Sequence, residues 1–265
     1  MPIVDIYVNY WQYEAMKRYD PIQYVELFHL FFLLQLGLKM DRRLYALKGG
    51  CNLRFFLKSI RYSQDMDIDV HTIQSNTLHN KVNKILEASS TKLFLQSNQM
   101  EILNYSTPKQ TQTTQKWKIS LKISTLSTPL NTKIEFSRRK MSQGVIYEPI
   151  DPLIIAKYQL TPQLVSHYNI NSAVEQKLQA LIGRNETQSR DVFDLYHLIN
   201  IGGQFPTLST EMLQQIQEHI TAISFEDFKG QVIAYLPIEY QAQYDSKEMW
   251  QTICLTVLGV LKKCV

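Results

Sequence analysis

Three aspartates at every second position are the residues best suited to chemistry in this chain. Asp65, Asp67 and Asp69 alternate with apolar residues through residues 65–70. Residues two apart project from the same face of a β-strand, so we expect the carboxylates on one face and the apolar side chains in the core. Because such close carboxylates repel one another, a divalent cation would stabilise them, and Mg²⁺ prefers hard oxygen ligands. The pattern predicts a magnesium site with Asp65 and Asp67 as catalytic metal ligands.

A glycine pair precedes this acidic strand. Gly49 and Gly50 lie between a short apolar stretch, residues 44–47, and residues 53–57, which look like the start of a helix. Backbone N–H groups at a helix N-terminus can hold phosphate. The chain has only nine glycines, so an adjacent pair at this turn indicates a phosphate-binding role. The alternative is an ordinary strand–turn–helix with a solvated acidic edge.

Glu135 is the candidate fourth acid. Residues 132–137 alternate in polarity, with Lys133, Glu135 and Ser137 on one face. If this strand pairs beside the acidic strand, Glu135 would join Asp65 and Asp67 around the same metal. Two-metal phosphoryl transfer needs such a cluster of carboxylates. The alternative is an exposed glutamate on a half-solvated strand.

Basic residues in the second half could contact phosphates. Lys177 and Arg184 share one stripe of an expected helix, separate from its buried stripe. Asp191 lies in the first turn of the next expected helix, where the helix dipole favours an acid. We expect Lys177 and Arg184 to face phosphates, with Asp191 positioning one of them or the acceptor. A solvated helix lysine and a purely structural first-turn aspartate are the alternatives.

The elements that would position these residues fall into an α/β unit, residues 1–150, and a helical unit, residues 151–265. Polar residues 106–115 are expected to form an exposed loop, and the pattern after residue 150 predicts helices and no strand. In the first unit we predict helices at 22–39, 50–58 and 77–90 and strands at 44–48, 64–71, 117–124 and 132–137. In the second we predict helices near 153–159, 172–183, 189–200, 209–221, 225–236 and 246–262.

Composition narrows the class of protein. The 265 residues carry a net charge of +4 and an isoelectric point near 8.8, a mild excess that permits nucleic-acid contact without requiring it. The three cysteines show no metal-ligand spacing and imply no disulfide framework, so we expect a reducing cytoplasm. The N-terminus lacks the pattern of a signal peptide. Residues 25–38 are apolar but too short and too polar in places for a membrane span, so we expect a buried helix and no membrane role.

Taken together, these residues resemble the AbiEii/AbiGii family of nucleotidyltransferase-like toxins, the toxin halves of type IV toxin–antitoxin systems, which includes the mycobacterial MenT toxins. The resemblance runs in order from about residue 22 to residue 200. Its motifs are Gly49-Gly50, Arg61-x-Ser63-x-Asp65-x-Asp67, Ile134-Glu135-Phe136, Glu175-x-Lys177-x-x-Ala180-x-x-x-Arg184 and Arg190-Asp191-x-x-Asp194-Leu195.

The resemblance implies a polymerase-β-like nucleotidyltransferase domain followed by a C-terminal helical domain. It also implies Mg²⁺-dependent transfer of a nucleoside monophosphate from an NTP to an acceptor, with RNA, and tRNA first, as the expected acceptor. An antitoxin encoded nearby would counter the toxin. The catalytic residues would be Asp65, Asp67, Lys177 and Asp191, and the metal ligands Asp65, Asp67 and Glu135. The nucleotide-binding residues would be Lys48, Gly49, Gly50, Cys51, Arg61, Ser63 and Arg184.

One position departs from the family pattern. Family members usually carry Thr or Ser after the glycines, and this chain carries Cys51. A thiol is a weak hydrogen-bond donor. The phosphate contact would therefore fall to the backbone or to Asn52.

Two other classes of function are consistent with the same residues. A small-molecule nucleotidyltransferase, such as an antibiotic-modifying enzyme, would have an acidic acceptor pocket, whereas an RNA-modifying enzyme would have a basic one. A catalytically silent nucleotide-binding module would not need the intact acids. The cluster Arg138, Arg139 and Lys140, which directly follows the Glu135 strand, is a candidate contact for an RNA backbone, or else a solvated basic loop.

Overall fold

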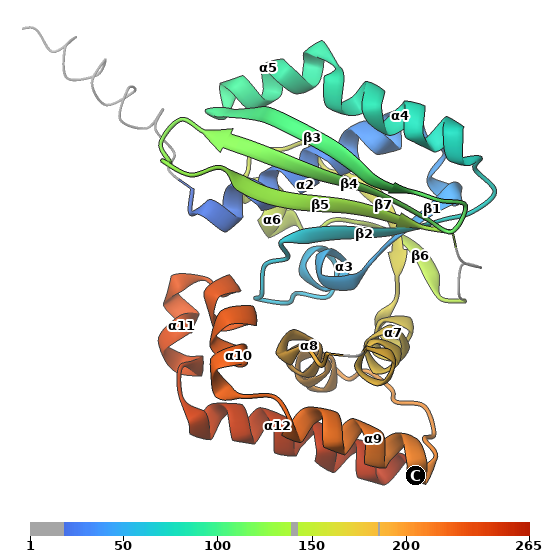
Figure 1. The fold of residues 1–265 in the computed structure, drawn as a ribbon, viewed down its shortest axis with the longest axis vertical. Helices are drawn as coiled ribbons and strands as arrows, with labels where there is room; N and C mark the ends of the chain where they lie inside the picture. The colour runs from blue at the N-terminus through green and yellow to red at the C-terminus, as the bar shows by residue number, and fades with distance from the viewer. Residues whose placement is uncertain (1–18, 139–142, 185) are drawn as a thin grey trace, which may run out of the picture.

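A computed structural model describes residues 19–138, 143–184 and 186–265 of the chain. In this part of the chain a seven-stranded mixed sheet lies between two layers of helices (Figure 1). The strand order is β3-β4-β5-β2-β1-β7-β6. The strands are β1 (Tyr45–Lys48), β2 (Asp65–Val70), β3 (Met100–Gln110), β4 (Thr114–Ile123), β5 (Leu130–Ser137), β6 (Val145–Pro149) and β7 (Leu164–Tyr168).

The centre of the sheet carries the acidic strand. β2 pairs antiparallel with β1 and parallel with β5. The register between β2 and β5 sets Asp65 opposite Lys133 and Asp67 opposite Glu135. The expectation that the Glu135 strand lies beside the acidic strand is therefore confirmed.

Three helices cover one face of the sheet (Figure 1). They are α2 (Pro21–Lys39), α4 (Ser75–Glu87) and α5 (Ser89–Ser97). α2 is apolar on nearly every side, and among the described residues it is the one helix long and apolar enough to cross a membrane. Most of α2 is buried against the sheet and its neighbours, which is the burial expected of a core helix.

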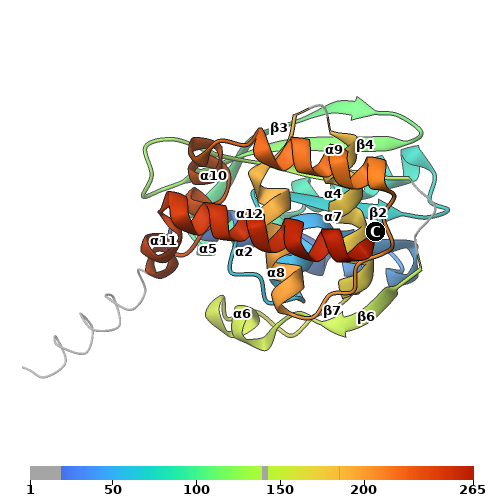
Figure 2. The same cartoon turned by 90° about the horizontal axis from the view of Figure 1, so that it is seen from below.

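The opposite side of the sheet carries α3 (Gly49–Phe55) and the helices of the second half. α9 and α12 lie across α7 and α8 on the side away from the sheet (Figures 1 and 2). α3 joins the two layers, because Phe55 packs in the sheet core and Leu53 in the helical core. These helices are α7 (Ile170–Gly183), α8 (Ser189–Asn200), α9 (Thr210–Thr221), α10 (Phe225–Gln231), α11 (Ile238–Tyr244) and α12 (Lys247–Leu261). The short helix α6 (Pro152–Lys157) instead packs Ile154 and Ile155 into the sheet core, beside α2 (Figure 1).

Two expectations about the sheet are wrong. Residues 106–110 are not a loop but the end of β3, which forms a hairpin with β4; they are polar because β3 is an edge strand with an open face. The region after residue 150 is not free of strands, since β7 pairs parallel with β1 at Leu47 and His167. The sheet core also includes Tyr158 and Val165. Where a boundary between two domains falls stays a prediction, but the sheet layer continues beyond residue 150.

Candidate active site

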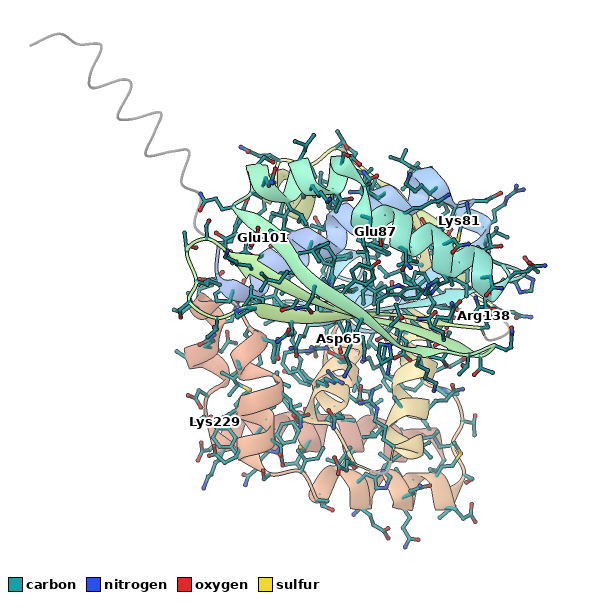
Figure 3. The ribbon with its side chains drawn as sticks, turned by 45° about the horizontal axis from the view of Figure 1, so that its top comes forward. Asp65, Lys81, Glu87, Glu101, Arg138 and Lys229 are labelled. Atoms are coloured by element: carbon teal, nitrogen blue, oxygen red, sulfur yellow. The ribbon has the colours of Figure 1, made fainter. Side chains whose placement is uncertain are left out.

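A cleft of about 520 Å³ lies between the β2–β5 face of the sheet and helix α7. Asp65 lies on the underside of the sheet, toward the helices of the second half (Figure 3). The cleft gathers residues that are up to 142 positions apart, from Lys48 to Arg190. Its lining residues are Lys48, Gly49, Gly50, Arg61, Ser63, Asp65, Asp67, Lys133, Glu135, Gln176, Lys177, Gln179, Ala180, Gly183, Arg184 and Arg190.

Lysines from neighbouring strands engage two of the three acids in the cleft. The Lys133 Nζ atom lies 3.1 Å from Asp65 Oδ2 and 3.9 Å from Glu135 Oε2. The Lys116 Nζ atom lies 3.0 Å from the same Glu135 oxygen. Lysines therefore already compensate the charges of Asp65 and Glu135. A metal ion that bridged these two carboxylates would compete with Lys133, whose Nζ atom lies between them.

Asp67 has a different environment. None of the described residues forms a salt bridge with its carboxylate. Burial raises the pKa of Asp67; Lys133 and Lys48 oppose that rise, while Glu135 and Asp65 add to it. Gly49 packs closely here, with a φ of +66° and an ideal Cβ position only 3.0 Å from Asp67 Oδ2. Asp67 is thus the acid whose charge most needs a partner from outside the chain.

Asp69 shares the strand face of Asp65 and Asp67 but does not line the cleft. It is buried, and its carboxylate accepts hydrogen bonds from Lys48 Nζ and, at 2.8 Å, from the Tyr168 hydroxyl. Tyr168 belongs to β7, a strand that the sequence pattern did not predict. Asp69 therefore holds Lys48 at the edge of the cleft.

The glycine turn leaves no room for a side chain at its second position. An ideal Cβ on Gly50 would lie 2.5 Å from Ser63 Oγ and 3.3 Å from Arg61 Nη2. The Ser63 hydroxyl donates to the Asp65 carbonyl at 2.8 Å. The turn, Ser63 and the start of β2 therefore pack as one unit, and the absent Cβ keeps the turn open to the cleft.

Cys51 and Asn52 do not point into this cleft. The buried Cys51 thiol lies 3.3 Å from the Asp65 carbonyl and 3.6 Å from His29 Nδ1. Burial, together with nearby carboxylates, raises the pKa of the Cys51 thiol well above its usual value. The Asn52 side chain donates to the Tyr168 carbonyl at 2.8 Å. A phosphate contact at these positions is therefore open only to the backbone, because both side chains belong to the core.

Lys177 and Arg184 form the opposite wall and share an aspartate. Lys177 Nζ lies 3.1 Å from Asp191 Oδ1 and 2.6 Å from Asp194 Oδ2, and Arg184 Nη1 lies 3.3 Å from Asp191 Oδ2. Burial alone would lower the pKa of Lys177, but the two carboxylates outweigh it and raise the pKa. Asp191 is fully buried behind both cations and does not line the cleft. In this arrangement it positions the cations.

Asp194 is a residue of the site that the sequence analysis quoted without assigning it a role. The Arg61 guanidinium forms a bidentate pair with the Asp194 carboxylate, with Nη2 at 2.9 Å from Oδ2 and Nε at 3.0 Å from Oδ1. Burial would raise the pKa of Asp194, but Arg61 and Lys177 hold it well below its usual value. Its spacing of three from Asp191 on α8 was the available signal, because residues three apart share a helix face.

The acids of the cleft suit a magnesium ion that is completed by substrate. Among the described residues, no three His, Cys, Asp or Glu side chains converge as a ready-made metal site. Mg²⁺ is usually held by one or two carboxylates together with water and substrate phosphates. Asp65 and Asp67 fit that requirement, because they share one strand face at the cleft and Asp67 lacks a salt-bridge partner among the described residues. The assignment of Glu135 as a third ligand stays a prediction.

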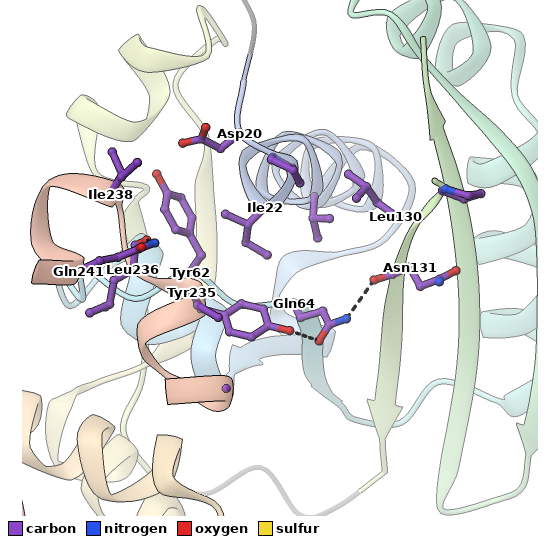
Figure 4. Close-up of a pocket in the computed structure, with 15 residues that line it drawn as sticks. Asp20, Ile22, Tyr62, Gln64, Leu130, Asn131, Tyr235, Leu236, Ile238 and Gln241 are labelled. Atoms are coloured by element: carbon purple, nitrogen blue, oxygen red, sulfur yellow. Dashed lines mark hydrogen bonds between the residues drawn. The ribbon is translucent and has the colours of Figure 1, made fainter. Parts of the chain in front are cut away.

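A second cavity, of about 580 Å³, adjoins the same strand (Figure 4). Gln64, between Ser63 and Asp65, forms one wall. Its side chain accepts a hydrogen bond from the Tyr235 hydroxyl at 2.7 Å and donates to the Asn131 carbonyl at 3.4 Å. Gln64 thus connects the acidic strand to both β5 and the helical layer.

Arg138 is the one residue of the basic cluster after β5 that the structure describes, and it does not take the position expected of the cluster. Arg138 donates to the Ile73 carbonyl at 3.2 Å and contacts Gln115, whose side chain reaches Ser75 of α4. Arg138 therefore faces the α4 side of the sheet, away from the cleft. Arg139 and Lys140 lie outside the described residues.

Comparison with known proteins identifies the family. The model of the family "Nucleotidyl transferase AbiEii toxin, Type IV TA system" matches residues 32–253. No curated protein matches the sequence. Two similar solved structures are JHP933 from Helicobacter pylori (TM-score 0.56, 16% identity, 92% of this chain and 95% of that chain covered) and MenT4, a nucleotidyltransferase toxin from Mycobacterium tuberculosis (TM-score 0.56, 16% identity, 93% and 96% covered).

At this identity the two structures support the fold alone, whereas the family model spans most of the chain and all of its cleft motifs. The resemblance drawn from the sequence motifs is thereby confirmed. The chain belongs to the AbiEii family of nucleotidyltransferase toxins of type IV toxin–antitoxin systems.

Proposed function

We propose that this enzyme transfers a nucleoside monophosphate from an NTP to RNA, with tRNA as the first candidate acceptor, and that Mg²⁺ supports the reaction. The observation that carries the proposal is the single cleft in which the glycine turn and two aspartates face Lys177 and Arg184. One wall offers backbone groups and carboxylates, and the other offers fixed cations. A nucleoside triphosphate needs both.

Different residues of the cleft would contact different parts of the triphosphate. The backbone N–H groups at Gly49 and Gly50 would donate to phosphate oxygens. The Ser63 hydroxyl could join them only by releasing the Asp65 carbonyl, to which it donates. Lys177 and Arg184 would neutralise the charge that collects on the leaving phosphates. Asp191 and Asp194 hold Lys177 in place, so the cation needs little rearrangement when the nucleotide binds.

The reaction is an exchange of one P–O bond for another. An acceptor hydroxyl oxygen attacks the α-phosphorus, the bond between the α-phosphorus and its bridging oxygen breaks, pyrophosphate leaves, and the hydroxyl proton passes to water. Asp65 and Asp67 would hold Mg²⁺, which supplies charge neutralisation at the phosphates and at the attacking oxygen. Lys133 contacts only the Oδ2 atom of Asp65, so a metal would either bind Asp65 through Oδ1 or displace the lysine.

The charge of the cleft favours a polyanionic acceptor. Six basic side chains line it, namely Lys48, Arg61, Lys133, Lys177, Arg184 and Arg190, against the three acids Asp65, Asp67 and Glu135. An enzyme that modifies a cationic antibiotic needs an acidic acceptor pocket. The lining is therefore not the acidic pocket that a cationic acceptor needs, even though the buried acids Asp69, Asp191 and Asp194 compensate several of these cations from behind.

The toxin role follows from the family, which also implies a partner antitoxin. In our proposal the enzyme acts in the cytoplasm, where NTP and tRNA are available, and modification of RNA arrests growth unless the antitoxin counters it. Three unlinked cysteines are compatible with that reducing compartment.

The test is to incubate the purified enzyme with Mg²⁺, total cellular RNA and each NTP labelled at the α-phosphate. We expect label on tRNA-sized RNA, and none with an Asp67→Asn variant of unchanged melting temperature. Label on no RNA, together with modification of an added aminoglycoside, would replace the RNA proposal with the small-molecule one.

A further inference from the structure

The open face of the sheet extends the cleft outward from the catalytic acids. Trp117 of β4 donates to Asn83 of α4 at 2.8 Å, so it faces the helices. Its neighbours Lys116 and Lys118 therefore face the other way. Lys118 is exposed, and α2, α4 and α5 cover only the opposite face (Figure 1).

Two rows of side chains cross this face from the edge strand to the acids. The strand registers align Ser106, Lys118, Lys133 and Asp65 in one row. They align Lys109, Lys116, Glu135 and Asp67 in the other. Each row thus runs from an aspartate in the cleft, Asp65 or Asp67, to a lysine on β4, Lys118 or Lys116.

The rows place lysines directly opposite one another. Lys118 faces Lys133, and Lys109 faces Lys116. Like charges opposite each other on neighbouring strands destabilise a sheet. None of the described residues forms a salt bridge with Lys109 or Lys118. Lys116 and Lys133 already pair with Glu135 and Asp65, so an anion lying across the rows would compensate chiefly Lys109 and Lys118.

A groove on the same face joins these rows to the catalytic strand. It has a volume of about 510 Å³, and it shares Asp65 and Lys133 with the catalytic cleft. Its other lining side chains are uncharged and polar apart from Lys118 and Ile119. They are Gln64, Asn104, Ser106, Ser120 and Asn131, which can hydrogen-bond to sugars and bases, and Thr132, whose buried hydroxyl is already bonded to the Gln64 carbonyl and His29.

We propose that the open face of β3, β4 and β5 binds the single-stranded end of the acceptor RNA, with its phosphates on Lys109 and Lys118 and its terminal hydroxyl directed at Asp65. This inference rests on the proposed function and names the surface through which the acceptor enters. An exposed, charged sheet face continuous with the catalytic cleft suits an extended strand, whose phosphates repeat along its length. It replaces the Arg138 cluster as the acceptor contact.

The test measures binding separately from transfer. A short single-stranded RNA with a fluorescent 5′ end is titrated with the enzyme in the absence of NTP, at several salt concentrations, and followed by anisotropy. The Lys109→Gln/Lys118→Gln variant should bind roughly tenfold more weakly at moderate salt. A plot of the logarithm of its binding constant against the logarithm of salt concentration should have a slope shallower by about 0.7 for each lysine removed. In transfer assays its KM for RNA should rise while kcat is retained.

Lys84→Gln is the matched control, because Lys84 is an exposed lysine on α4, on the covered side of the sheet. It should bind RNA as the wild type does. If the double variant also binds like the wild type, or if no form binds RNA, the inference is overturned. If the wild-type enzyme labels RNA and the double variant still binds RNA normally, the proposed surface is wrong but the proposed reaction stands. If binding depends on the two lysines but no RNA is labelled, the proposed surface stands and the proposed transfer to RNA is wrong.

Discussion

Asp65 and Asp67 share one strand face but differ in what surrounds them. Lys133 compensates Asp65 at 3.1 Å, whereas Asp67 has no salt-bridge partner among the described residues and lies against Gly49. A carboxylate without a counter-ion inside a cleft is the group most in need of a bound cation. Asp67 is therefore the residue on which the account of catalysis depends most.

Replacing Asp67 with Asn should reduce nucleotide transfer by about 10³-fold or more, the scale on which a single electrostatic stabiliser matters. The fold should persist, because the change removes repulsion with Asp65 and Glu135. Steady-state transfer rates and melting temperature, measured together, check this. Transfer within a few-fold of the wild type would show that Asp67 is not at the reacting centre.

Gly50 should tolerate no side chain. In Gly50→Ala the new Cβ would lie 2.5 Å from Ser63 Oγ, so the turn must shift, and we expect NTP affinity to fall about tenfold or more and the melting temperature to drop. Gly259→Ala is the control, since nothing lies within 4 Å of its Cβ position and it lies on α12, outside the cleft. Equal NTP affinity for both variants would contradict a tight phosphate turn.

At the scale of elements, one network of buried salt bridges connects the helical layer to the sheet layer. Arg61 comes from the segment before β2, Lys177 from α7 and Asp194 from α8, and all three are buried. Removing one partner of a buried network leaves the others uncompensated. The network should therefore govern both stability and the width of the cleft.

Asp194→Asn should lower the free energy of unfolding by about 3–5 kcal/mol at neutral pH. The pKa of Asp194 is depressed in the folded state, so its contribution is present above the unfolded pKa of about 3.9 and is lost as pH falls below it. Denaturant unfolding at pH 7 and below pH 4 should show the difference between variant and wild type shrinking. Asp245→Asn, in an exposed pair with Lys229, should cost less than about 1 kcal/mol.

His29 of α2 gives the sheet layer a separate dependence on pH. It is buried beside Thr132 of β5, and burial lowers its pKa to about 3. Because the folded protein holds it neutral while the unfolded chain protonates near pH 6.5, stability should fall as pH drops from about 6.5 toward 3. Its share is at most about 1.4 kcal/mol per pH unit. His29→Gln should flatten the curve across that range, and unchanged curvature would contradict a neutral buried imidazole.

At the scale of the whole molecule, local patterns could be read from the sequence and long-range pairings could not. The alternation at residues 65–70 and the glycine pair are local, and the structure has them as a strand and a turn into a helix. β7 was missed because Ser166 and His167 interrupt its apolar pattern. Both are buried against segments that are distant in the sequence, since Ser166 donates to the Arg42 carbonyl and His167 stacks on Phe56.

The site shows the same division. The position of Asp67 beside Glu135 follows from register, which the sequence analysis could state only as a condition. Cys51 was expected near phosphate from its place after the glycines, but the rotation of α3 turns its thiol into the core. Asp194 became part of the site only when α8 packed near Arg61.

Expression of the intact enzyme should arrest growth, because the chain belongs to a toxin family and the proposed reaction modifies RNA. The arrest should disappear with Asp67→Asn at equal protein level, and co-expression of the neighbouring antitoxin gene should relieve it. Colony counts after induction measure both effects. Arrest by the Asp67→Asn protein would indicate a toxic action independent of the cleft.

The most direct test of the central claim, that this cleft transfers a nucleoside monophosphate, is the fate of two differently labelled NTPs. The enzyme is incubated with Mg²⁺ and total RNA, using an NTP labelled at the α-phosphate in one reaction and at the γ-phosphate in the other. The account predicts α-label on RNA and γ-label only in released pyrophosphate, with both lost in Asp67→Asn. Transfer of γ-label to the acceptor, or release of label as free phosphate without any α-labelled product, would contradict it.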